Sequence, residues 1–486
     1  MTLETRTVRG IGWAAASQLA QTLMSILITA ILARLLTPSD FGLIAMVFVF
    51  SNFATIFSGF GLQSAIVQKI EVSDEAVSAT FWINVGLGAL LTVALAASAP
   101  LIAAFYNEPR LAPLVVFIST TFFIASFCNV PYALLTKRMN FKAIGIIGIC
   151  SIVISGPIAI FLAFSGYGVW SLAWLTVLSS VFTTVFTLIY ARWVPHLLLG
   201  LQHVRGLLRF GANLTGASFI IYFAQNMDNL LVGRFLGPTA LGFYNLAYNL
   251  LVLPVTAISN VVGRVMFPAL SIIQHDKRLV RDAYVRANRY IAAISFPLMI
   301  WVLVAAPELI RVVYGPKWVP VIPLIQIFAL AGLEQSIAFN VNWLFTSQGR
   351  TDMMFRLSIF TTVAVLISFV VGLRGGVEGV VIAYTVTLYL TAYPVFAFAF
   401  RLIDMKVKDA LAPLWSVTLA ALTLGIAAFL LRISLEKLGV TQDLTVLVIV
   451  TAASLLIYSI VLFLLDKELF IGIVRLLDQL RSADST

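Results

Sequence analysis

Two stripes of amide and hydroxyl side chains lie 200 residues apart in otherwise apolar sequence, and both have helical spacing. Members of the first stripe fall within about 60° on a helix of 100° per residue, and they are Gln18, Thr22, Ser25 and Thr29. The equivalent positions 200 residues later are Ser218, Tyr222, Gln225 and Asn229. Such side chains can hydrogen-bond a polar ligand or water, or one another between helices.

The segments that follow each stripe also carry a polar face. The first holds Asn52, Thr55, Gly59 and Gln63, and the second holds Asn245, Asn249, Thr256 and Asn260, with Arg264 at its end. Lipid does not solvate amides, so these faces must contact protein or water. Two interpretations stay open: hydrogen bonding between helices of one lobe, or a hydrated cavity lined by all four segments, with Arg264 at its cytoplasmic mouth.

Two acidic residues lie well inside apolar segments. Asp228 has Asn226 and Asn229 beside it, and Glu334 is followed by Gln335. A carboxylate at the middle of a membrane costs a few kcal/mol and needs a partner or water. Each acid is either a neutral carboxyl that hydrogen-bonds an amide, or a site for a coupling ion, proton or sodium.

Two arginines, Arg34 and Arg234, end the segments that carry the stripes. Long basic side chains at helix ends reach phosphate headgroups, and they can equally bind a diphosphate. No cofactor, metal or disulfide is expected. Cys128 and Cys150 lie in apolar runs, and the three histidines, at 196, 203 and 275, lie in or beside polar loops outside any ligand motif.

The composition is that of a membrane protein. Of the 486 residues, 61% are apolar and only 11% are charged, against roughly a quarter charged in soluble domains. This excludes a soluble enzyme, a disordered chain and a secreted disulfide scaffold. Long apolar runs exclude a β-barrel. The net charge of +10 indicates basic cytoplasmic loops rather than nucleic-acid binding.

Runs long enough to cross a membrane predict about fourteen transmembrane helices. Their approximate limits are 11–36, 41–67, 79–105, 111–135, 141–164, 168–191, 211–236, 241–267, 290–314, 319–346, 355–373, 377–400, 411–433 and 443–465. With the N-terminus inside, 23 of the 31 Lys and Arg lie in inner segments and 8 in outer ones. Basic residues favour the cytoplasmic side, so we expect both termini in the cytoplasm.

A nine-residue motif repeats at the same offset as the stripes. Residues 34–42 read RLLTPSDFG and residues 234–242 read RFLGPTALG. Six predicted spans separate the copies, so both have the same orientation, which indicates a parallel repeat. We expect a six-helix N-lobe at 1–191, a cytoplasmic linker at 192–210, a six-helix C-lobe at 211–403, and a last helix pair with a cytoplasmic tail at 404–486. Two such lobes around a cavity suit alternating access.

The loop between the eighth and ninth predicted spans is basic. Lys277, Arg278, Arg281, Arg286 and Arg289 lie within thirteen positions. Residues 278–289 can be drawn as a helix with a weak apolar side, so we expect 270–289 to form a helix lying on the anionic inner leaflet.

Several short motifs stand out along the chain: residues 35–42 (LLTPSDFG), 59–68 (GFGLQSAIVQ), 131–142, 228–237 (DNLLVGRFLG), 314–318 (YGPKW) and 348–352 (QGRTD). Together they resemble the motifs of the polysaccharide transporter family. The family belongs to the superfamily of multidrug exporters and the lipid II flippase. The resemblance implies movement of undecaprenyl-diphosphate-linked oligosaccharides across the bacterial inner membrane, for lipopolysaccharide, capsule or exopolysaccharide assembly. It implies membrane lipids, a polysaccharide polymerase and other assembly proteins as partners.

The same resemblance bears on the ion. Asp228 matches in kind a sodium-binding aspartate of the lipid II flippase. The second aspartate expected in the eleventh span is missing, because residues 357–373 offer only Ser358, Thr361, Thr362 and Ser368. Sodium, protons and a gradient-free mechanism therefore all stay open.

Two other functions compete with the flippase. A small-molecule drug exporter predicts an aromatic, acidic cavity, whereas these stripes are rich in amides. A glycan-transferring membrane enzyme predicts a large outer loop with acids, arginine or histidine, whereas the predicted outer loops are at most about a dozen residues long. We therefore expect a transporter and not an enzyme.

Overall fold

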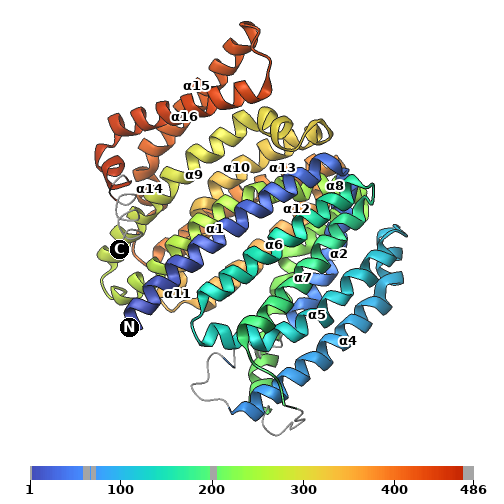
Figure 1. Ribbon diagram of the computed structural model, residues 1–486. Coiled ribbons are helices and arrows are strands. Elements are labelled where there is room, and N and C mark those ends of the chain that lie inside the picture. Colours follow the sequence, from blue (N-terminus) through green and yellow to red (C-terminus); the bar gives the residue numbers. More distant parts are fainter. Residues whose placement is uncertain (1–2, 59–65, 67–72, 197–204, 474, 476–486) are drawn as a thin grey trace. The chain divides into compact units, whose positions relative to one another are not determined.

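The structure is a computed structural model of the whole chain, and it describes all residues except 1–2, 59–65, 67–72, 197–204, 474 and 476–486. Every regular element in the described residues is a helix (Figure 1). The predicted all-α fold is confirmed. By contact density the chain divides into two compact units, Met1–Gly242 and Phe243–Thr486. The four-part domain organisation expected from the sequence stays a prediction.

The first unit contains both polar stripes, at residues 18–29 and 218–229. Its helices are α1 (Leu3–Leu35), α2 (Pro38–Ser58), α4 (Asp74–Tyr106), α5 (Leu111–Lys137), α6 (Phe141–Phe164), α7 (Val169–Ala191) and the first part of α8 (Arg205–Ile272).

The second unit begins within α8. Its other helices are α9 (Lys277–Val313), η2 (Pro316–Val321), α10 (Ile322–Ala338), α11 (Val341–Ser347), α12 (Thr351–Gly372), η3 (Leu373–Gly375), α13 (Gly376–Arg401), α14 (Val407–Leu411), η4 (Ala412–Leu414), α15 (Trp415–Lys437) and α16 (Asp443–Leu465).

Eleven segments of the described chain are long and apolar enough to cross a membrane. They coincide with twelve of the predicted spans, because one 51-residue segment, Thr351–Arg401, contains both α12 and α13. The other two predicted spans fall on α8, which is 68 residues long and breaks at Gly237. The chain is thus a multi-pass membrane protein.

Within the first unit, α1 packs on α6, α4 on α5, and α7 on both α5 and α6. Glycines make the α1–α6 approach close. A Cβ added to Gly145 would lie 2.7 Å from Ser17 Cβ, and one added to Gly156 would meet the Ile28 side chain. Small residues allow such contacts between helices in lipid, where hydrophobic burial does not drive association.

The second unit has its own core, in which α9 packs on α10, α15 and α16. The cluster includes the fully buried side chains of Leu344, Phe400 and Val417. Ion pairs add to the packing of α9 at two places along its length. Glu308 pairs with Arg432 at 2.8 Å, and Arg289 pairs with Asp466.

The predicted surface helix at 270–289 is wrong. Asp276 accepts hydrogen bonds from the backbone N–H groups of Arg278 and Leu279 and starts α9, which runs on unbroken to Val313. Its 37 residues correspond to about 55 Å at about 1.5 Å per residue. This exceeds the roughly 30 Å hydrocarbon core, so the basic turns are an extension of a span and not a separate element.

Candidate functional site

The polar stripe of α1 is not sealed against the neighbouring helix. Gln18 and Ser25 are exposed, and Thr22 and Thr29 are half-buried. The side of α1 that packs on α6 carries Ser17, Gln21 and Ile28, about 90° away on a helix of 100° per residue. The stripe therefore faces away from the α1–α6 packing.

The polar face of α2 is exposed in the same way. Asn52 and Thr55 are both exposed, and Thr55 Oγ1 satisfies itself locally by donating to the Asn52 carbonyl oxygen at 2.6 Å. The Asn52 side-chain amide lies at the exposed surface of the helix. Gln63, predicted to extend this face, lies outside the described residues.

The stripe of α8 meets α2 within the first unit. The Tyr222 hydroxyl donates to the carbonyl oxygen of Val49, and the Tyr222 and Phe53 rings lie 5.7 Å apart. These contacts bring a predicted stripe residue of the second copy beside the polar face of the first. Ser218 and Gln225 lie on the α8 backbone, but their side chains are outside the described part.

Asp228 is buried nearly two helical turns beyond Tyr222 on α8, with 5% of its surface exposed. Its Oδ1 accepts the backbone N–H of Asn229 at 2.7 Å. The acid is thus held close to its own helix, beside Asn229. The side chain of Asn229 is half-buried beside it.

The second unit carries the remaining predicted cavity residues. Asn249 is exposed and donates from Nδ2 to Asn245 Oδ1 at 2.6 Å, so the two amides form one continuous polar patch on α8. Asn260 and Arg264 continue the same helix, with side chains outside the described residues.

Glu334 has an unusual environment on α10. Its Oε2 is buried and has no hydrogen-bond partner in the described part of the chain. The neighbouring polar groups are already engaged: Gln335 Nε2 donates to the Tyr384 hydroxyl at 2.7 Å, and the Tyr389 hydroxyl donates to the Leu330 carbonyl oxygen at 2.9 Å. An unpaired buried carboxyl oxygen is costly and is relieved by a proton or a cation.

The two predicted arginines differ in their surroundings. Arg34 is exposed at the end of α1. Arg234 is half-buried, with its guanidinium 5.6 Å from the Phe105 ring centroid, and its Nη1 donates to the Asn107 side-chain oxygen at 2.7 Å. Arg34 is thus the more exposed of the two.

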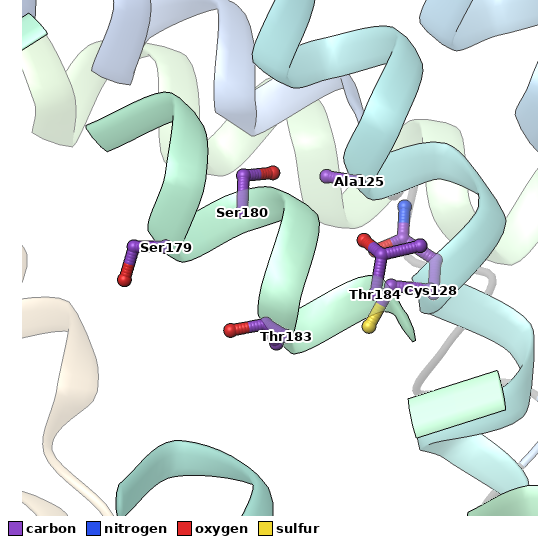
Figure 2. A pocket seen from close by; sticks show the side chains of 7 residues that line it. Ala125, Cys128, Ser179, Ser180, Thr183 and Thr184 are labelled. Atoms are coloured by element: carbon purple, nitrogen blue, oxygen red, sulfur yellow. The ribbon is translucent and has the colours of Figure 1, made fainter. Parts of the chain in front are cut away.

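A polar recess between α5 and α7 was missed by the sequence analysis. It has a volume of about 220 Å³, and its lining residues are Ala125, Cys128, Asn129, Ser179, Ser180, Thr183 and Thr184. Figure 2 shows the Ser180 hydroxyl on α7 pointing toward α5. The sequence does show four hydroxyl residues at positions i, i+1, i+4 and i+5 of one span. It does not show that Asn129, which lies on another span, lines the same recess.

Hydrogen bonds hold part of this lining in place. Thr183 Oγ1 donates to Ser151 Oγ at 3.1 Å, and Thr184 Oγ1 donates to the Ile124 carbonyl oxygen at 3.2 Å. In the described part of the chain the Ser179 and Ser180 hydroxyls make no such bond, so they are free to bind water or a hydroxylated ligand. No cluster of three or more metal-ligating side chains occurs in the described residues.

Comparisons with known proteins agree with one another. Residues 31–323 match the family model described as "Polysaccharide biosynthesis protein". The lipopolysaccharide biosynthesis protein WzxC of Escherichia coli is 30% identical over 378 residues, 76% of each chain. The succinoglycan biosynthesis transport protein ExoT of Rhizobium meliloti is 24% identical over 99% of this chain and 97% of its own.

The fold also matches a solved structure. The lipid II flippase MurJ in an inward closed conformation superposes with a TM-score of 0.73 at 14% identity, covering 94% of this chain and 99% of that one. At this identity the match concerns the fold alone. The family resemblance inferred from the sequence motifs is confirmed.

Proposed function

Because the chain belongs to the polysaccharide biosynthesis protein family, we propose that it is a flippase for undecaprenyl-diphosphate-linked oligosaccharides. It moves them across the bacterial cytoplasmic membrane, with both of its termini in the cytoplasm, for lipopolysaccharide, capsule or exopolysaccharide assembly. The relatives named for lipopolysaccharide biosynthesis and for succinoglycan transport support this substrate class. Membrane lipids are its surroundings, and a polysaccharide polymerase and other assembly proteins are its expected partners.

The observation that carries the proposal is the polar surface that membrane-spanning helices leave uncovered. Gln18, Ser25 and Asn52 are exposed on α1 and α2, although both helices are apolar enough to span a membrane. A sugar moiety needs amides and hydroxyls along its path because it loses its water on entry. The polyprenyl tail needs no such path and can stay in lipid.

The recess between α5 and α7 adds a second hydrogen-bonding surface in the same unit. Its free hydroxyls on Ser179 and Ser180 suit sugar hydroxyls, which are both donors and acceptors. Arg34 and Arg264 are the cations we assign to the diphosphate, since charge-assisted hydrogen bonds to phosphate are the strong ones. We also assign Arg234 to the binding of the diphosphate or of lipid headgroups. Its contacts with Phe105 and Asn107 orient the guanidinium group.

Asp228 and Glu334 are the residues we assign to the coupling ion. Asp228 is buried on α8, and Glu334 on α10 has a buried carboxyl oxygen, Oε2. A cation bound at either would remove a buried negative charge and make closure of the surrounding helices less costly. This supports an ion-driven mechanism, with the identity of the ion to be found by experiment.

Reconstitution gives a direct test. Proteoliposomes containing the purified protein and a fluorescent undecaprenyl-diphosphate oligosaccharide should show movement of the label between leaflets, scored by a membrane-impermeant quencher. Asn52→Ala and Ser180→Val should each slow this movement several-fold, whereas Gly86→Ala, at an exposed glycine with open space around it, should not. Movement of a cationic dye but not of the lipid-linked sugar would instead establish a drug exporter.

A further inference from the structure

Two glycines and two prolines of the repeated motif meet inside the first unit. A Cβ added to Gly42 would overlap the carbonyl oxygen of Pro238, and a Cβ added to Gly242 would overlap the carbonyl oxygen of Pro38. Each glycine therefore faces the proline of the other copy. This reciprocity is that of a contact across a two-fold axis, and it brings the two backbones closer than any side chain larger than hydrogen allows.

A layer of apolar side chains adjoins the crossing. Leu43 and Met46 of α2 and Leu241 of α8 have no exposed surface. Gly233 lies against the same layer, since a Cβ there would lie 3.2 Å from Leu241 Cδ2 and 3.3 Å from Met46 Cε. Fully buried side chains on both segments exclude water at this level.

We propose that the crossing of residues 38–42 with residues 238–242 is the closed outer gate of the transport path, and that its closure depends on the absence of a Cβ at Gly42 and Gly242. The inference rests on the proposed function, because only a transporter needs this contact to open. The distribution of Lys and Arg assigns these helix ends to the outer side. Release of a substrate outward then requires the two segments to separate.

The contact atoms explain why alanine should act on one state only. The group opposite each glycine is a backbone carbonyl, which cannot turn away by changing rotamer. An added methyl group is therefore accommodated only by separating the segments, so the closed state loses stability while the open state is unaffected. Because the contact is reciprocal, Gly42→Ala and Gly242→Ala should have equal effects.

The test is outside accessibility. In the full-length protein with Cys128→Ala and Cys150→Ala, a single reporter Asn52→Cys is labelled in right-side-out vesicles by a membrane-impermeant maleimide. Gly42→Ala and Gly242→Ala should each raise the labelling rate about tenfold. The control Gly86→Ala, which meets nothing within 4 Å, should label at the parent rate. Equal rates in all three variants would overturn the gate.

A second measurement avoids the risk that the alanine variants fold poorly. Ser39→Cys with Thr239→Cys places thiols next to the two prolines in a protein that keeps both glycines. A short bifunctional thiol reagent should join them rapidly, and several-fold more slowly when Gly42→Ala is added. Absence of cross-linking in the parent pair would refute the gate. Neither measurement uses the lipid-linked sugar. If the glycine variants change labelling and cross-linking as expected but the sugar does not move in proteoliposomes, the proposed substrate is wrong and the gate is supported.

Discussion

Thr37 and Gly237 occupy equivalent positions in the two motif copies, and each starts a helix in a different way. Thr37 donates from its N–H and its hydroxyl to Asp40 Oδ2, and the Asp40 N–H donates back to Thr37 Oγ1, which forms a capping box. In the second copy Ala240 replaces Asp40, so no carboxylate is available. Gly237 instead adopts φ 84° and ψ 179°, a conformation open essentially to glycine alone.

The two copies also differ at residues 28 and 228, in the helix that leads into each motif. Ile28, 7% exposed, packs on Gly156 of α6, whereas its counterpart Asp228 is 5% exposed and accepts the Asn229 N–H. Both side chains are buried, but the first is apolar and the second is a carboxylic acid. The comparison teaches that the repeat preserves the backbone crossing at 42 and 242, while local capping and side-chain chemistry have diverged. Because an apolar residue occupies this position in the first copy, we propose a functional rather than a packing role for the Asp228 carboxylate.

The largest effect is expected at that carboxylate. Asp228→Asn keeps the size of the side chain and an oxygen that can accept the Asn229 N–H, but it fixes the neutral form. Sugar movement in proteoliposomes should lose its dependence on a proton or sodium gradient altogether. Glu334→Gln is the matched variant at the other buried acid. If Asp228→Asn transports at the wild-type rate with unchanged gradient dependence, Asp228 is a structural hydrogen-bonding group.

Much of this architecture could be predicted from the sequence because it follows from hydropathy and charge. Lipid demands long apolar helices, so the spans and the break near Gly237 were visible in the sequence. The repeat predicted symmetry but not contact, since periodicity does not say which glycine faces which carbonyl. The separate surface helix at 270–289 was wrong because an amphipathic pattern does not show where a helix ends. The α5–α7 recess needed tertiary packing to unite Asn129 with Ser180.

The next effect concerns the glycine start of the second copy. Gly237→Ala places a Cβ in a conformation that L-residues rarely adopt, at a cost of about 1–3 kcal/mol. We expect a lower thermal midpoint of the purified protein in detergent. Gly375→Ala is the matched control, because Gly375 has φ −95° and nothing lies within 4 Å of an added Cβ. An unchanged midpoint for Gly237→Ala would mean that the break relaxes without the left-handed conformation.

The smallest effect concerns the capped start of the first copy, and a reciprocal exchange measures it. Asp40→Ala removes the carboxylate that accepts two hydrogen bonds from Thr37, and loss of such a cap costs about 1 kcal/mol. Ala240→Asp offers a carboxylate to the second copy, but Gly237 has no hydroxyl to complete the box, so the gain should be at most a few tenths of a kcal/mol. The thermal midpoint should therefore fall with Asp40→Ala and hardly change with Ala240→Asp. Equal and opposite shifts would show instead that the carboxylate acts through the helix dipole alone, and that the two starts are electrostatically equivalent despite their different geometry.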